Sequence, residues 1–181
     1  METIHCMLDL ETLSTRSNAR IVAIGAVLFT RKGGLGERFY TPVKTPDLER
    51  ARRITSPFHV EERTILWWEQ QPEAARYVLW DERAVPIHIA LNWFSDFLAF
   101  HTNDDVRMWG NGAAFDNAIL ATAYNLMGIE PPWKFYNDRC YRTVKNMYPD
   151  VPMKREGTHH NAVDDAVSQA KHLLSFGVYL S

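Results

Sequence analysis

The stretch MLDLETLSTR, residues 7–16, places two carboxylates at the end of an apolar segment that begins at Ile4. Apolar side chains precede the carboxylates, as is typical of a buried strand. Side chains two positions apart on a strand project to the same face, so Asp9 and Glu11 would point at one spot. There the carboxylates repel each other unless a cation or a proton lies between them. The alternative is a solvated strand end, because acidic side chains are common at surfaces.

The composition is that of one globular domain spanning residues 1–181. Hydrophobic residues make up 46% of the chain and charged residues 23%, close to the values of ordinary folded domains. The longest strongly apolar run, residues 21–29, is too short to cross a bilayer, and the N-terminus lacks the pattern of a signal peptide. Cys6 and Cys140 form neither a disulfide framework nor a metal-ligand motif. These features predict a cytoplasmic protein without membrane contacts.

The charge balance argues against one class of function. The chain has 20 basic and 22 acidic residues, a formal net charge of −2. Proteins that hold nucleic acid by bulk charge usually carry a strongly basic face. The balance still allows an enzyme that handles a few nucleotides locally.

The order of predicted elements indicates an α/β protein. Apolar, β-branched runs at 3–11, 20–30 and 38–43, with glycines between the last two, predict an antiparallel meander. Helical patterns and short strands then alternate. Helices are predicted at 56–71, 72–80, 86–101, 115–128, through Val144 and Met147, and at 159–177, with strands at 105–110 and within 134–140. This order predicts one mixed sheet flanked by helices.

Further acids fall where a strand ends or a helix begins. Asp116 follows the strand at 105–110, and Asp164 and Asp165 lie in the last helix behind His159 and His160. Each position has an ordinary alternative: a helix N-cap for Asp116 and a solvated helix face for the other two acids. Taken together, the acids and the histidine fit a nuclease with two Mg²⁺ or Mn²⁺ ions, which prefer oxygen ligands. A histidine near such ions can act as the general base.

Three segments resemble, in order, the motifs of DnaQ-like 3′→5′ exonucleases of the DEDDh type. They are DLET (9–12), NGAAFDNAIL (111–120) and HNAVDDA (160–166). The resemblance implies a ribonuclease H-like mixed sheet, an antiparallel meander followed by parallel strands. Segments such as TILWWEQQ (64–71) are similar to small phage and bacterial exonucleases of the exonuclease VIII-like group, which implies a bacterial or phage-infected host cell. Cys140 stands where that group has an acid.

The resemblance also implies a role for each residue of the motifs. Asp9, Glu11 and Asp165 would hold one ion, Asp9 and Asp116 would serve a second, and His160 would be the general base. In a regular helix Asp164 would share the face of His160, which favours Asp164. The family places its histidine on the loop before the helix, which favours Asp165. If the third motif were shifted along the sequence, His159 would take the role of general base in place of His160.

The implied substrate is a single-stranded DNA or RNA 3′ end, cleaved to nucleoside 5′-monophosphates. Thr12 and Leu13 lie where the family contacts the 3′-terminal nucleotide, and Asn111 and Phe115 of the second motif complete the expected substrate set. The alternative is a catalytically inactive nucleic-acid-binding relative, although no acid of the set is missing. Because small relatives are frequently homodimers, a homodimer is a further expectation.

Other candidate contacts have two interpretations each. Trp67 and Trp68 either stack on bases or pack in the core, and adjacent helical positions allow at most one to face a ligand. Arg139 and Arg142, three apart on a predicted helix, either grip phosphate or form surface ion pairs. The densest basic run, Arg50, Arg52 and Arg53, predicts a solvated face.

Overall fold

Five strands form one mixed sheet in the computed structural model, which describes residues 2–51, 55–102 and 105–177. Their order across the sheet is β3-β2-β1-β4-β5. The pairs β1–β2 and β2–β3 are antiparallel, whereas β4 and β5 run parallel to β1. The strands are β1 (His5–Thr12), β2 (Ile21–Thr30), β3 (Gly34–Pro42), β4 (Arg107–Gly110) and β5 (Asp138–Cys140). The predicted α/β fold, a meander followed by parallel strands, is confirmed.

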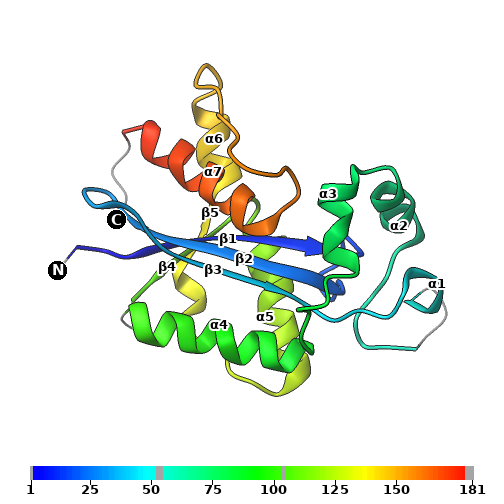
Figure 1. The fold of residues 1–181 in the computed structure, drawn as a ribbon. Coiled ribbons are helices and arrows are strands. Elements are labelled where there is room, and N and C mark those ends of the chain that lie inside the picture. Colours follow the sequence, from blue (N-terminus) through cyan, green and yellow to red (C-terminus); the bar gives the residue numbers. More distant parts are fainter. Residues whose placement is uncertain (1, 52–54, 103–104, 178–181) are drawn as a thin grey trace.

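Helices cover both faces of this sheet. Figure 1 shows α4 and α5 on one face, α6 and α7 on the other, and α2 and α3 beside the end of β1 that carries the arrowhead. The helices are α1 (Leu48–Ala51), α2 (Glu62–Glu69), α3 (Glu73–Arg76), α4 (Ile87–His101), α5 (Asp116–Met127), α6 (Tyr141–Met147) and α7 (Ala162–Ser175). Among the residues described, no helix is both long and apolar enough to cross a membrane.

The alternation of side chains along β1 divides the core in two. Leu8 and Leu10 pack with residues of α4 and α5, whereas Met7 packs with residues of α6 and α7. Since alternate residues of a strand share a face, Asp9 and Glu11 lie on the same face as Met7. The apolar strand therefore delivers two carboxylates towards α7.

The close approach of α7 to the sheet depends on Gly25 of β2. Gly25 pairs with Asp9 in the β1–β2 register. A Cβ atom at this position would lie 2.2 Å from the backbone carbon of Ala162, the first residue of α7. Glycine therefore allows the start of α7 to rest directly on the sheet beside Asp9.

Two helix starts differ from the predicted ones. Helix α2 begins at Glu62 rather than near Ser56, because Ser56 and His59 bind the residues around Asn18 and Arg20. Helix α7 begins at Ala162 rather than at 159, because the Asn161 side chain caps it by accepting from the Asp164 amide (3.3 Å).

The predicted helix carrying both Arg139 and Arg142 is wrong. Arg139 lies on β5 and Arg142 on α6, so the two side chains do not share a helical face. Of the basic run at 50–53, Arg52 and Arg53 lie outside the described residues.

Candidate active site

Three carboxylates from opposite ends of the chain meet at one point. Asp9 and Glu11 come from β1, and Asp165 comes from the first turn of α7. One oxygen atom from each of the three lies within 4.8 Å of the others. The structure thus brings together three of the residues that the sequence motifs selected.

The fourth carboxylate, Asp116, reaches the cluster from the other face of the sheet. It is the first residue of α5, Phe115 is the N-cap, and no side chain caps this helix, so the N-cap interpretation of Asp116 is wrong. Its Oδ1 accepts a hydrogen bond from the Leu10 amide (3.2 Å). A Cβ atom on Gly110 would lie 2.9 Å from the Asp116 Cβ, so this glycine permits the approach.

The four acids line one cavity of about 220 Å³. Burial, together with the charges of Asp116 and Asp165, raises the pKa of Asp9 well above its usual value. Burial and the Asp9 charge do the same for Glu11, and burial raises the pKa of Asp116 to about 7. Low-dielectric surroundings and mutual repulsion both disfavour the charged forms. The acids therefore need protons or cations to share this space.

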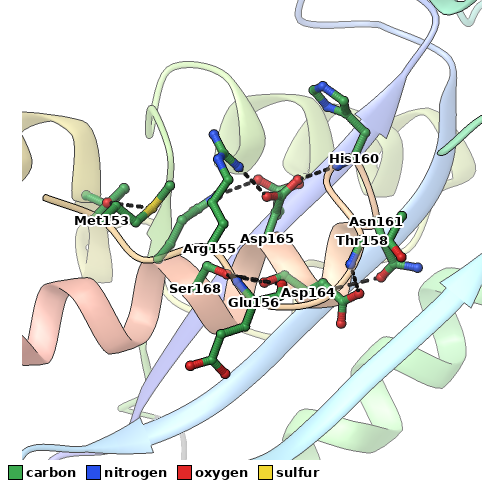
Figure 2. A network of polar contacts seen from close by, with 12 residues as sticks. Met153, Arg155, Glu156, Thr158, His160, Asn161, Asp164, Asp165 and Ser168 are labelled. Carbon is green, nitrogen blue, oxygen red and sulfur yellow. Dashed lines mark hydrogen bonds and ion pairs between the residues drawn. The ribbon is translucent and has the colours of Figure 1, made fainter. Parts of the chain in front are cut away.

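The segment that precedes α7 determines which of its two acids faces the cluster (Figure 2). Asp165 Oδ1 accepts from Arg155 Nη1 (2.7 Å), and Asp165 Oδ2 accepts from the His160 amide (2.9 Å). Asp164 instead accepts from the Thr158 amide (2.8 Å). Asp165 alone of the two lines the acidic cavity.

His160 lies on the loop before α7, as the resemblance implies. Its φ of 63° is left-handed, so the helical spacing that would align it with Asp164 does not apply. Its ring packs edge-on against Trp67, with centroids 4.8 Å apart. Burial and the neighbouring His159 lower the pKa of His160, so its ring is neutral at pH 7 and can accept a proton. His159 also lines the cavity but is more exposed.

Two residues at the site were missed by the sequence motifs. Gln169 Nε2 donates to Asp9 Oδ1 (2.7 Å), and Arg155 forms an ion pair with Asp165. The signal for Gln169 was available, because it lies four residues after Asp165 and therefore shares its helical face. Arg155 sits in a loop without periodicity, so no sequence pattern placed it.

The adjacent residues Trp67 and Trp68 of α2 have different surroundings, as neighbouring positions of a helix require. Trp68 is 1% exposed and its Nε1 donates to the Thr12 carbonyl (2.9 Å), which ties α2 to the end of β1. Trp67 is 39% exposed. It lines a second cavity of about 430 Å³, which adjoins the acidic cavity at Leu10, Glu11 and Phe115.

The predicted substrate residues fall in different places. Thr12 lines the second cavity, Asn111 the acidic cavity, and Phe115 both. Leu13 is fully buried, and its amide and carbonyl are bonded to Arg20 and Glu61. A substrate contact by Leu13 therefore does not fit its position, because neither its side chain nor its backbone is available.

Solved structures of exonucleases share this fold at low sequence identity. The nuclease domain of 3′hExo, a DEDDh family member bound to rAMP, is 14% identical with a TM-score of 0.63, covering 97% of this chain and 92% of that one. E. coli exonuclease I in complex with a dA16 oligonucleotide is also 14% identical, with a TM-score of 0.63. The match covers 97% of this chain and 41% of exonuclease I. No curated protein matches the sequence.

A family model settles the membership that the fold alone leaves open. The model describes the 3′-5′ exoribonuclease Rv2179c-like domain and matches residues 4–176. The match spans all five strands and all four acids of the cluster. The chain belongs to the 3′-5′ exoribonuclease Rv2179c-like family and is a 3′-5′ exonuclease.

Proposed function

We propose that the protein removes nucleoside 5′-monophosphates one at a time from single-stranded 3′ ends, using two divalent metal ions and a histidine base. The observation that carries this proposal is the meeting of Asp9, Glu11 and Asp165 within 4.8 Å, beside a histidine held outside the helix. The similarity to the exonuclease VIII-like group, the cytoplasmic location and the homodimer stay predictions.

The acidic cluster fits a pair of Mg²⁺ or Mn²⁺ ions. Asp9, Glu11 and Asp165 offer carboxylate oxygens, the ligand type that these ions prefer. Asp116 Oδ2 is buried and has no hydrogen-bond partner within the described residues, so it retains capacity for a cation. When bound, such ions stabilise charge on the phosphate and lower the pKa of the attacking water.

His160 is proposed as the general base. Its lowered pKa leaves the ring neutral at pH 7, the form that accepts a proton from water. The backbone amide of His160 donates a hydrogen bond to Asp165, and the ring packs against Trp67 at the rim of the cluster. The hydrogen bond fixes the backbone of His160, and the ring itself contacts Trp67 and His159.

The second cavity is proposed to hold the 3′-terminal nucleoside. It joins the acidic cavity at Glu11 and Phe115 and exposes Trp67, whose indole offers a surface for a base. Stacking of this kind tolerates any base. The family's exoribonuclease description makes RNA the first substrate to test, with DNA as the comparison.

The test is shortening of 5′-labelled RNA and DNA oligonucleotides with Mg²⁺, with Mn²⁺ or with EDTA. We expect metal-dependent, stepwise loss from the 3′ end of single strands and slower loss from a blunt duplex. Asp9→Asn should abolish it, whereas Asp96→Asn, an exposed change on α4, should not. Binding of the oligonucleotide without shortening would instead support the inactive, nucleic-acid-binding alternative.

A further inference from the structure

Two cations of α6 stand at the edge of the acidic cavity. Arg142 and Lys145 are three residues apart, a spacing that places side chains on the same side of a helix. Both are exposed, and both line the cavity that holds the four acids. Helix α6 is anchored behind them by Tyr141, which is buried and whose hydroxyl bonds to His172 Nδ1 (2.6 Å).

The side chain of Arg142 lies beside Gly112 and near Asp116. A Cβ atom on Gly112 would lie 3.8 Å from Arg142 Cζ, so the guanidinium rests against the loop between β4 and α5. The Arg142 charge also lowers the pKa of Asp116, which opposes the larger effect of burial. The guanidinium thus lies beside the acidic cavity.

Neighbouring cations are engaged elsewhere, whereas this pair is not. Arg155 is bonded to Asp165, Lys171 to Glu156, and Arg139 to main-chain carbonyls. Within the described ranges, neither Arg142 nor Lys145 forms an ion pair with a carboxylate. Two cations without an ion-pair partner among the described residues therefore line a cavity that also holds four acids.

We infer that Arg142 and Lys145 bind backbone phosphates of the strand on the 5′ side of the scissile bond. The inference rests on the proposed function, since the ligand is the remainder of the same strand. With the terminal nucleoside in the cavity of Trp67 and its 5′ phosphate at the acids, the chain continues into the acidic cavity, where α6 forms the edge.

The net charge of the protein supports a role for these two cations in binding a nucleic-acid strand. Every nucleotide upstream of the cleavage point brings one negative charge towards a cluster of acids, on a protein whose net charge is −2. Binding of a strand then depends on local cations. An arginine offers two parallel hydrogen bonds to phosphate, and a lysine offers a compact charge.

The test is the salt dependence of binding by a 5′-fluorescein RNA octamer, measured by anisotropy with Ca²⁺ in place of Mg²⁺. Each phosphate contact on a single strand contributes about 0.7 to the slope of log affinity against log salt. Arg142→Gln and Lys145→Gln should each reduce the slope by about 0.7. When the salt is raised from 50 to 200 mM, the affinity of each variant should therefore fall by a factor about 2.5-fold smaller than that of the wild type. The double variant should lose about twice that slope.

Lys134→Gln is the matched control, because it removes the same charge from an exposed residue that lines a different hollow. Its slope should equal that of the wild type. Circular dichroism and the unfolding temperature establish that each variant is folded.

Ligand length separates upstream contacts from a contact with the terminal nucleotide. The fold loss of affinity in Arg142→Gln should be larger for the octamer than for a nucleoside 5′-monophosphate. Equal losses for the two ligands, or an unchanged salt slope, would overturn the inference while leaving the proposed function intact. If the wild type does not bind the octamer at all, both proposals fail.

Discussion

Asp164 and Asp165 are neighbours in sequence with different surroundings. Asp165 points at Asp9 and Glu11, whereas Asp164 accepts from the Thr158 amide and lies against Gly157. Asp164 therefore stabilises the loop that precedes α7. This leaves Asp165 as the acid that faces the cluster.

This difference predicts opposite outcomes for two identical changes. Asp165→Asn should lower kcat/KM by about 100-fold or more, because it removes a proposed metal ligand worth several kcal/mol of transition-state stabilisation. Asp164→Asn should stay within about fivefold of the wild type, since the amide oxygen still accepts from Thr158. Single-turnover cleavage of a labelled RNA measures both. Comparable losses in the two variants would contradict the assignment.

Arg155 is bonded to Asp165, one of the proposed metal ligands. Its guanidinium is bonded to Asp165 Oδ1 at 2.7 Å, and its charge offsets a small part of the rise that burial causes in the pKa of Asp9. A metal ion bound at the cluster would therefore compete with the arginine for the negative charge of that cluster. The arginine acts as a cation supplied by the chain itself.

We expect Arg155→Gln to bind Mn²⁺ more tightly, by about fivefold, because removing a partly exposed cation is worth roughly 1 kcal/mol. Isothermal titration calorimetry without substrate measures this affinity. Lys154→Gln is the control, since it removes the same charge from the adjacent residue, which lines a separate hollow with His172. Weaker Mn²⁺ binding in Arg155→Gln than in the control would show that Arg155 supports the site rather than competing for it.

At the scale of elements, the contact between α7 and β2 sets the position of Asp165. The first residue of α7 rests on Gly25, which pairs with Asp9. Any side chain larger than hydrogen at this position pushes the helix away from the sheet. The distance between Asp165 and the β1 acids therefore depends on one glycine of a third element.

Gly25→Ala should lower the free energy of unfolding by about 1–3 kcal/mol, as expected for an overpacked contact, and should also weaken Mn²⁺ binding. Urea denaturation and calorimetry measure the two effects. The control is Gly36→Ala on β3, where the nearest atom to an added Cβ is 3.5 Å away, an ordinary contact. A Gly25→Ala protein with wild-type stability would show that α7 does not rest on the sheet at this point.

At the scale of the whole molecule, the acidic cluster makes the free energy of unfolding depend on pH. The pKa of Asp116 is raised to about 7, and those of Asp9 and Glu11 are raised well above their usual values. The folded state then binds more protons than the unfolded state from about pH 4 up to those raised values. The free energy of unfolding therefore falls as pH rises through this range.

One buried histidine works in the opposite direction. Burial lowers the pKa of His5 to about 4, so the unfolded state binds the extra proton between pH 4 and 6.5, and this group favours folding as pH rises. Asp9→Asn leaves His5 unchanged. The difference between the wild type and Asp9→Asn therefore isolates the acids.

With EDTA, we expect the unfolding temperature of the wild type to fall more than that of Asp9→Asn as the pH is raised from 5.5 to 7.5. With Mn²⁺ present, the fall in the wild type should shrink, because cations take the place of protons. Differential scanning fluorimetry measures both series. Equal pH profiles for the two proteins in EDTA would rule out the acidic cluster as the source of the dependence.

Much of the fold was predictable from local patterns. The apolar runs at 3–11 and 20–30 and the helix at 86–101 coincide closely with β1, β2 and α4, because burial of one face imposes a period of two or 3.6 residues on the sequence. The same period of two places Asp9 and Glu11 on one face without any knowledge of the remaining chain. Helix α2 starts later than predicted because Ser56 and His59 bind the distant segment around Asn18 and Arg20, whereas α7 starts later because Asn161 caps it locally.

The sequence by itself therefore determined the mixed sheet, its flanking helices and the shared direction of Asp9 and Glu11, since these depend on neighbours along the chain. Only the tertiary structure decided that Asp165 rather than Asp164 faces them, that Gln169 and Arg155 bond to acids of the cluster, and that Leu13 is fully buried. Those outcomes depend on how closely α7 packs on β2 and how the loop closes before it. The contact of Gln169 with Asp9 joins segments 160 residues apart, and the contacts of Asp165 depend on an irregular loop, so no periodic pattern places them.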